Sequence, residues 1–523
     1  MTYTISNSTL TLSRRALMVG VLALGAAYLP HTMACAAEHN VFTLGKAGDP
    51  DNIDPAVTGT NNSFTVTYPA YERLVKYKGS ASDIVGELAE SWEASPDAKV
   101  WTFKIAKGHK FADGTPVTNE AVKFSIERVV KVEKSQSKQF TQINNIELVD
   151  GDSIRFTLEN PSATFLSLLA GSGASIVNPA VMQHETAGDM GQAYLAGHTM
   201  GSGAYQVTSW EKGQQIVMEP NQHYPGTPAL KKVVIRIIKD ATARRLQLEK
   251  GDLDLVEDLP SDQLESLASV KDVAIVDEPG FFVTYLYLNN KSAPLDKVKV
   301  RQAISYAMDY QGIIDGVLHG KAKQMRGAVP SGMWSHDETV KQYTYDPEKA
   351  KALLEEAGVS NAKLGFLYAK TDPNWEVTGL VLQQALAPLG IALEMQENDY
   401  PTMRDKIDKG NFDIAIGNWS PDLADPSEFV KWWFDSKYQG LSGNRAFYSN
   451  PAVDKMIRDA DVISDQAARE EAYKKVQAIA AEEAPYVMLF QRNFQVAMRK
   501  NVEGYVYNPM LLQMYNFADM KKN

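Results

Sequence analysis

A regular alternation of strand and helix signals between residues 346 and 416 restricts this chain to an α/β fold. Asp346 is a typical N-cap residue, Pro347 occupies the first helical position, and Gly358 ends the helix. Further strands are predicted at 364–368, 391–395 and 412–416, with helices at 375–389 and 400–409 between them. Because strands that alternate with helices pair in parallel, these segments predict a parallel sheet covered by helices.

Two earlier parts of the chain extend this interpretation. Residues 233–238, 241–250 and 253–256 have the pattern of one strand-helix-strand unit, and Gly251 ends its helix. A separate block at 79–195 is predicted to contain a strand at 101–105, a turn at 113–116 and a helix that begins at Thr118. The chain shows no repeats and no long flexible linker, so we expect its domains to be joined by short crossings.

Residues 1–37 are predicted to be a signal peptide that directs the chain out of the cytoplasm. Arg14 and Arg15 precede an apolar run at 16–29, and small residues follow, so we expect cleavage near Ala36 or Ala37. The run is shorter than the roughly 20 residues of a membrane-spanning helix. The sequence leaves general and twin-arginine export both open, and it also leaves open lipidation at Cys35.

Composition excludes several classes of function. The 523 residues include 53 Lys and Arg against 64 Asp and Glu, a net charge of -11 that argues against a nucleic-acid partner. Cys35 is the only cysteine, and the eight histidines show no paired ligand spacing, so we expect no disulfide, metal site or cofactor. No phosphate loop or nucleophile elbow is found. A hydrolase that uses two carboxylates stays open, because carboxylates are plentiful.

The segment 417–422 follows the last predicted strand and reads Gly-Asn-Trp-Ser-Pro-Asp. It is therefore expected to be a loop at the carboxyl end of the parallel sheet. Ligands of open α/β sheets bind at that end.

Several motifs, in order over most of the chain, resemble one family. They are Ile53-Asp54-Pro55, Tyr71 to Val75, Phe111 to Thr118, Gly201 to Tyr205, Asn221 to Gly226, Gly251-Asp252 and Val300 to Asp309. Their sequence and order are similar to those of the extracytoplasmic solute-binding proteins of ABC importers, in family 5, which includes dipeptide- and oligopeptide-binding proteins. Small departures, such as Ser202 and Ala204, leave the resemblance intact.

The resemblance implies an α/β, two-lobed periplasmic-binding-protein fold of type II, with an extra subdomain in the first lobe. The first lobe would comprise residues 38–282, including the block at 79–195, and the second lobe 283–490. The segment 491–523 would return to the first lobe. Two chain crossings are expected near 280–287 and 486–495.

The resemblance also suggests site residues. In peptide-binding relatives an aspartate shortly after a tryptophan holds the ligand's amino group, and Trp419 and Asp422 resemble that pair, with Asn418 beside them. Asp422 could instead cap the turn before Asp425, and Trp419 could instead fill the core. Because the strand before Trp419 has no basic residue, Arg445 is the candidate for a ligand carboxylate, although it could equally be solvated. Nearby aromatic residues are expected mostly to pack: Trp432, Trp433, Tyr438, Phe447 and Tyr448.

The function that these inferences favour is capture of di- or oligopeptides by a monomeric binding protein that delivers them to the permease subunits in the inner membrane. Two alternatives stay open. The same fold could bind a nickel chelate, glutathione, an opine, an oligosaccharide or haem, and an exported carboxylate-dependent hydrolase would belong to another class.

Overall fold

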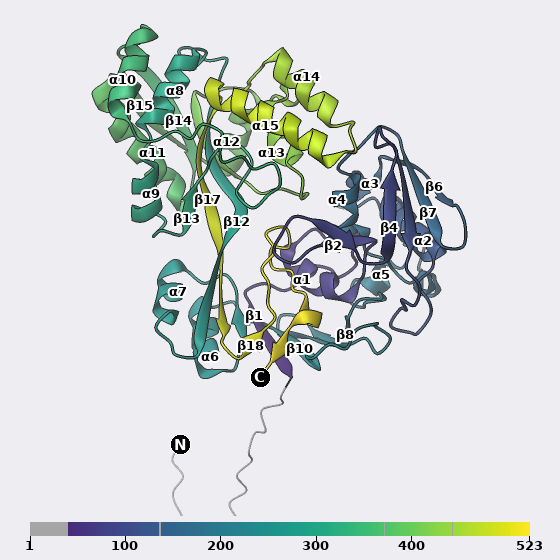
Figure 1. Cartoon of the computed structure of the whole chain (residues 1–523). Helices are drawn as coiled ribbons and strands as arrows, with labels where there is room; N and C mark the ends of the chain where they lie inside the picture. Colours follow the sequence, from purple (N-terminus) through teal and green to yellow (C-terminus); the bar gives the residue numbers. More distant parts are fainter. Residues whose placement is uncertain (1–39, 135–136, 371, 442) are drawn as a thin grey trace, which may run out of the picture. The chain divides into compact units, whose positions relative to one another are not determined.

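A computed structural model describes residues 40–523, apart from 135–136, 371 and 442 (Figure 1). Its central element is an 11-stranded sheet in the order β15-β14-β16-β12-β17-β11-β1-β10-β9-β8, with β13 on the side of β17. We call the half with β14 to β16 the second lobe and the half with β1 and β8 to β11 the first lobe. The expected leader at 1–37 lies outside the described residues.

The second lobe contains the parallel strands that the sequence predicts. Strand β14 (Ala362–Ala369) pairs in parallel with β15 (Ile391–Asn398) and β16 (Ile414–Trp419). The predicted helices are α10 (Pro347–Glu356), α11 (Pro373–Leu386) and α12 (Tyr400–Asp408). Asp346 caps α10 as expected, because its side chain accepts a hydrogen bond from the Lys349 N–H. The other helices are α8 (Val298–Ala307), α9 (Tyr310–Gly316), α13 (Ser427–Phe434), α14 (Pro451–Ala460) and α15 (Gln466–Glu483).

Two expectations for this sheet were wrong. It is mixed, because β16 pairs antiparallel with β12 (Val273–Leu288). In addition, β16 continues to Trp419, so Asn418 and Trp419 lie in the strand and only 420–422 follow it. The extension has a physical cause: Thr284 and Val283 of β12 continue the pairing opposite Asn418 and Trp419.

The lobes are connected by two long antiparallel strands, β12 and β17 (Tyr486–Arg499) (Figure 1). The segments 280–287 and 486–495, expected to be the crossings, lie within these strands. Short β13 (Ala322–Gln324) pairs with β17.

In the first lobe, β1 (Val41–Lys46) lies between β10 (Lys232–Ile237) and β11 (Leu255–Val256), parallel to both. The predicted strand-helix-strand unit is therefore present, with α6 (Ala241–Lys250) as its helix, but another strand separates its two strands. Strands β8 (Tyr205–Glu211) and β9 (Gln215–Pro220) complete this half in antiparallel pairing. Helices α1 (Asn61–Ala70) and α7 (Ser261–Leu267) also belong to it.

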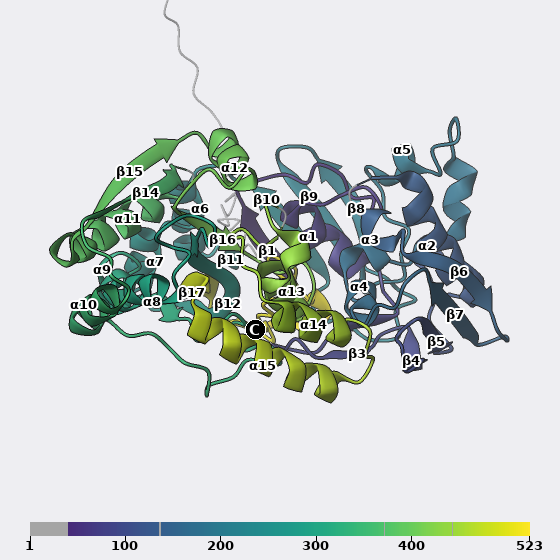
Figure 2. The same ribbon diagram turned by 90° about the horizontal axis from the view of Figure 1, so that it is seen from above.

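The block expected at 79–195 contains its own antiparallel sheet, β4-β5-β7-β6, which lies away from β14 and β15 in Figure 2. The predicted strand and helix are β5 (Val100–Ile105) and α2 (Asn119–Val132), and Thr118 caps the helix. The block has a separate hydrophobic core. Its other elements are β3 (Ile84–Gly86), β4 (Ala89–Ala94), β6 (Ile143–Leu148), β7 (Ser153–Leu158), α3 (Ser137–Phe140), α4 (Phe165–Leu169) and α5 (Gln192–Leu195). Strand β2 (Val75–Tyr77) lies just before the block and pairs with β3. Strands β18 (Val502–Glu503) and β19 (Lys521–Lys522) form a pair near the carboxyl end.

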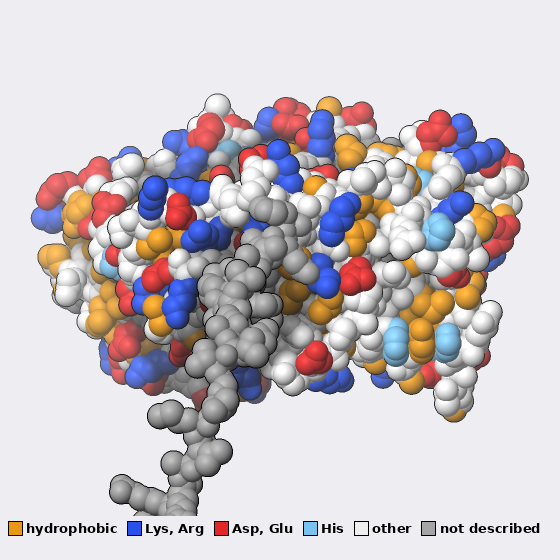
Figure 3. All heavy atoms as spheres, turned by 90° about the horizontal axis from the view of Figure 1, so that it is seen from below, with side chains coloured by type: hydrophobic (Ala, Val, Ile, Leu, Met, Phe, Trp, Pro, Cys, Tyr) orange, Lys and Arg blue, Asp and Glu red, His pale blue; other side chains and the backbone are white. Residues whose placement is uncertain are grey.

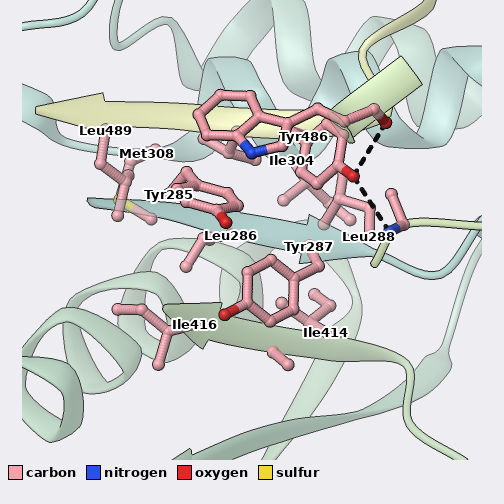
Figure 4. Packing of buried hydrophobic residues seen from close by; sticks show 14 of the residues in the cluster. Tyr285, Leu286, Tyr287, Leu288, Ile304, Met308, Ile414, Ile416, Tyr486 and Leu489 are labelled. Atoms are coloured by element: carbon pink, nitrogen blue, oxygen red, sulfur yellow. Dashed lines mark hydrogen bonds between the residues drawn. The ribbon is translucent and has the colours of Figure 1, made fainter. Parts of the chain in front are cut away.

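The largest hydrophobic core lies in the second lobe, around the upper parts of β12 and β17 (Figure 4). Tyr285 and Tyr287 of β12 pack beside Tyr486 of β17. The Tyr486 hydroxyl donates to the Trp433 carbonyl at 3.1 Å and accepts from the Ala446 N–H at 3.2 Å. A buried tyrosine with both bonds made fixes α13 and the 446 segment against the strand pair.

Acidic and basic side chains are interspersed on the face shown in Figure 3, outside the grey atoms. Within the part of the chain that the structure describes, no helix is both long and apolar enough to cross a membrane.

Candidate functional site: a charged cleft at the end of β16

The end of β16 forms the floor of a cavity of about 460 Å³ in the second lobe. Asn418 is fixed there by hydrogen bonds at both ends of its amide. Its Oδ1 accepts from the Thr284 hydroxyl at 2.8 Å and from the Trp375 indole at 3.4 Å, and its Nδ2 donates to Asp372 Oδ2 at 3.0 Å. The Asn418 side chain is therefore held in one orientation by its neighbours. The remaining walls are Phe282, Tyr287, Tyr400, Met403, Arg404, Ile407, Gly417, Leu441 and Arg445.

Arg445 is buried in the wall of this cavity, with 9% of its surface exposed. Its Nε donates to the Leu441 carbonyl at 3.0 Å, and Nη1 donates to the Tyr285 hydroxyl at 3.3 Å. The guanidinium lies over the Trp419 ring at 5.2 Å, a cation-π contact. No carboxylate of the described residues lies within ion-pair distance of it. The alternative that Arg445 is solvated is therefore wrong, because Tyr285 and Trp419 enclose it.

The charge of Arg445 persists despite this enclosure. Burial alone would lower the pKa of the guanidinium, but the side chains of Tyr285 and Tyr287 raise it above its ordinary value. A buried cation without an anionic partner is costly. An anion that entered the cavity would remove this cost.

Asp422 lies beyond the end of β16, on a second cavity of about 180 Å³. This cavity is formed by residues of both lobes, including Tyr77 of β2 and Gly171 and Ser172 of the inserted block. The Asp422 side chain is exposed, and within the described chain its carboxylate makes no hydrogen bond or ion pair. Partial desolvation by the cavity wall raises the pKa of this carboxyl group above its ordinary value. Asp425, rather than Asp422, caps the following turn, since its Oδ1 accepts from the Ser427 N–H at 2.9 Å.

Glu428, which no sequence pattern singled out, contacts the backbone of Asp422. Its Oε2 accepts from the Asp422 N–H at 3.1 Å, and its Oε1 accepts from the Trp432 indole at 3.3 Å. Burial, together with the charge of nearby Asp422, raises the pKa of Glu428 to about 7. Glu428 thus fixes the backbone at Asp422 without lining either cavity.

Trp419 lies in the chain between Asn418, which lines the first cavity, and Asp422, which lines the second. Its side chain is half-buried. Its ring meets Trp433 edge-on at 6.5 Å, and its indole nitrogen is buried without a hydrogen-bond partner among the described residues. The other aromatic residues that were expected to pack do so. Trp433 and Tyr448 are buried, while Trp432 pairs with Tyr438 at 4.6 Å and Phe447 with Phe412 at 6.4 Å.

The sequence profile of the bacterial extracellular solute-binding proteins, family 5, matches residues 83–440. The chain belongs to this family. Its members are solute-binding components of ABC importers and are binding proteins. In this chain the two lobes are joined by β12 and β17, and charged groups lie at the end of β16.

Individual relatives resemble this solute-binding protein over most of its length. The probable D,D-dipeptide-binding periplasmic protein DdpA of Escherichia coli K12 is 48% identical over 492 residues, 93% of this chain and 95% of its own. The structure of HbpA2 from Haemophilus parasuis has a TM-score of 0.85 at 22% identity and covers 92% of this chain and 100% of its own. DppA from Helicobacter pylori, in complex with the peptide STSA, has a TM-score of 0.71 at 27% identity, with coverages of 92% and 98%.

The structure brings three of the four predicted site residues together in this solute-binding protein. Asn418 and Arg445 line one cavity and Trp419 packs against Arg445, whereas Asp422 lies on the other cavity. Sequence reasoning missed Asp372 and Trp375, although both belong to the N-terminal turn of α11, which follows a strand of the parallel sheet. Among the described residues, no group of three or more His, Cys, Asp or Glu side chains is placed to hold a metal ion.

Proposed function

We propose that this solute-binding protein captures short peptides in the periplasm by holding their free amino end at Asp422. The observation that carries the proposal is the carboxylate itself. It is exposed to a cavity bounded by both lobes, and no group in the described chain pairs with it. An ammonium group there would form a charge-assisted hydrogen bond, and closure of the lobes around the ligand would exclude water from it. The printed names of two relatives support a peptide ligand, one as a D,D-dipeptide-binding protein and one in complex with a peptide.

The second charge of such a ligand would be met by Arg445. Asn418 lines the first cavity and Asp422 the second, and the backbone between these two residues spans at most about 14 Å. A zwitterionic peptide therefore has an anionic group at one end of this segment and a buried guanidinium at the other. Trp419 would pack against the ligand, and Asn418 would hold the cavity floor.

Closure follows from the position of Asp422. A ligand held there would contact Tyr77 and Gly171 of the first lobe as well as Asp422 of the second, so it would favour the arrangement in which the lobes are close. We place the division between the lobes within β12 and β17, near 282 and 490, and assign the segment after 491 to the first lobe. The closed, monomeric protein then presents the unchanged peptide to the permease subunits, and no bond of the ligand is broken.

A thermal-shift panel tests the proposal. At a hundred times its dissociation constant, a ligand adds about 2.7 kcal/mol to the free energy of unfolding. D-alanyl-D-alanine, an L,L-dipeptide and a tripeptide should raise the melting temperature, and N-acetylated forms should not. Shifts with a nickel chelate, glutathione, an opine, an oligosaccharide or haem alone would contradict the peptide assignment. Cleavage of the peptide, detected by mass spectrometry, would contradict the proposal that the protein is no enzyme.

A further inference from the structure

The pairing of β12 with β17 is interrupted at two places, between Pro279 and Val283 and between Thr284 and Tyr285, and the first interruption is the longer one in β12. Pro279 lies opposite Asn493 and Val283 opposite Gln491, so residues 280–282 of β12 face the single residue Arg492. The backbones are close here: a Cβ atom at Gly280 would lie 3.0 Å from the Arg492 carbonyl oxygen. Because a bulge bends a strand pair and disrupts its ladder, the connection between the lobes can bend here.

The side chain of Arg492 leaves this bulge toward the second lobe. Its guanidinium lies 5.3 Å from the Phe282 ring and 6.0 Å from the Phe490 ring. Nη2 donates to Asp372 Oδ2 at 2.6 Å. Asp372 is itself fixed as the N-cap of α11, where its Oδ1 accepts from the Asn374 N–H at 3.0 Å. The bulge is thus tied to the start of a helix.

The same oxygen of Asp372 also holds the cavity floor. Oδ2 accepts from Asn418 Nδ2 at 3.0 Å, and Asn418 in turn accepts from Thr284 of β12. Asp372, Asn418 and Phe282 all line the cavity that contains Arg445. One carboxylate oxygen therefore connects the bulge of both crossing strands with the wall of the cavity.

The geometry points to Asp372 as a positioning residue that couples occupancy of the second-lobe cavity to bending at the 280–282 bulge. A shift of Asn418 on ligand entry and a shift of Arg492 on bending act on the same two hydrogen bonds, so each motion changes the free energy of the other. The coupling during ligand capture rests on the proposed function, whereas its effect on the ligand-free protein does not.

A double-mutant cycle tests the coupling, with Asp372→Asn and Arg492→Met as the single changes. The affinity for D-alanyl-D-alanine, measured by calorimetry, should fall about tenfold in each single variant. It should also fall only about tenfold in the double variant, because both changes break the same bond between Arg492 and Asp372. A hundredfold loss in the double variant, or unchanged affinity in the singles, would overturn the proposal. The matched control is Asp277→Asn in β12, which disrupts an ion pair with Lys321 and a hydrogen bond from Asn493 beside the same bulge, but touches neither Asp372 nor the cavity. A tenfold loss there as well would also overturn it.

A second readout needs no ligand. Spin labels at cysteines introduced at Ser209 and Lys351, in a Cys35→Ala background, report the distance between the lobes. In the ligand-free protein, Asp372→Asn should broaden or shift the distance distribution, whereas Asp277→Asn should leave it closer to that of the wild type. Identical distributions for the wild type and Asp372→Asn would exclude the coupling. If the wild type bound no peptide, the proposed function would fail, and this measurement would still decide the role of Asp372.

Discussion

At the scale of single residues, the site is defined by charges whose partners are incomplete. Asp422 has a carboxylate without a donor in the described chain, and Arg445 has a buried guanidinium without a carboxylate. Glu428 differs from these two residues, because burial and the charge of the neighbouring Asp422 favour its neutral form. Asp422 and Arg445 are therefore our candidates for ligand binding, whereas Glu428 holds the backbone at Asp422.

The raised pKa of Glu428 predicts a pH dependence of stability. Its folded pKa of about 7 lies above the ordinary value of 4.5, so the folded state binds more protons than the unfolded state between these values. The stabilisation is complete below about pH 4.5 and is lost as the pH rises through 7, a change of about 3 kcal/mol. Glu428→Gln should remove this part of the pH dependence, measured by urea unfolding at pH 5 and pH 8. An unchanged difference between the two pH values would contradict the assignment.

Only some of these residues could be chosen from the sequence. Asp422 and Trp419 were chosen because they lie at or just beyond the end of a predicted strand and resemble a family motif, and their roles in binding stay predictions. Asp372 could not be chosen, since its partners Asn418 and Arg492 lie 46 and 120 residues away. The burial of Arg445 was equally hidden, because Tyr285 is 160 residues distant. Local patterns carry no information about such contacts.

At the scale of elements, helix caps and strand patterns were sufficient for most of the second lobe. The caps at Asp346 and Thr118 and the stop at Gly251 were predicted correctly because each depends on neighbouring residues only. The end of β16 was not, because its last two residues are strand only through pairing with β12. The site therefore sits on a strand end held by a partner 134 residues away, as the bond between Thr284 and Asn418 shows.

Gly417 illustrates how tightly this strand end is packed. A Cβ atom at this position would lie 1.5 Å from the Tyr287 hydroxyl, next to Arg445. Gly417→Ala should therefore displace Tyr287, cost about 1–3 kcal/mol of stability and weaken peptide binding. Gly316→Ala is the matched control, since its Cβ would meet nothing within 4 Å. Chemical unfolding and calorimetry should show loss in the first variant only, and equal behaviour of the two would contradict the packing argument.

At the scale of the whole described chain, one sheet runs through both lobes and only β12 and β17 connect its halves. Asp54, which belongs to one of the family motifs, contributes to this architecture. Its carboxylate accepts two hydrogen bonds from the buried Arg128 of α2, at 2.8 and 2.5 Å, and so fixes the inserted block to the first lobe. The resemblance could predict this architecture, but the bulge at 280–282 and its tie to Asp372 required the structure. Capture then depends on a ligand that reaches both sides of the Asp422 cavity.

Calorimetry with a peptide and its N-acetylated form, on the wild type and on Asp422→Asn, tests this account most directly. In the wild type, acetylation should weaken binding about 30-fold or more, corresponding to at least about 2 kcal/mol for a charge pair in a desolvated site. In Asp422→Asn, the free peptide should bind as weakly as the acetylated one, and unfolding should be unchanged. If acetylation weakened binding equally in both proteins, or in neither, the amino end would not be held by Asp422.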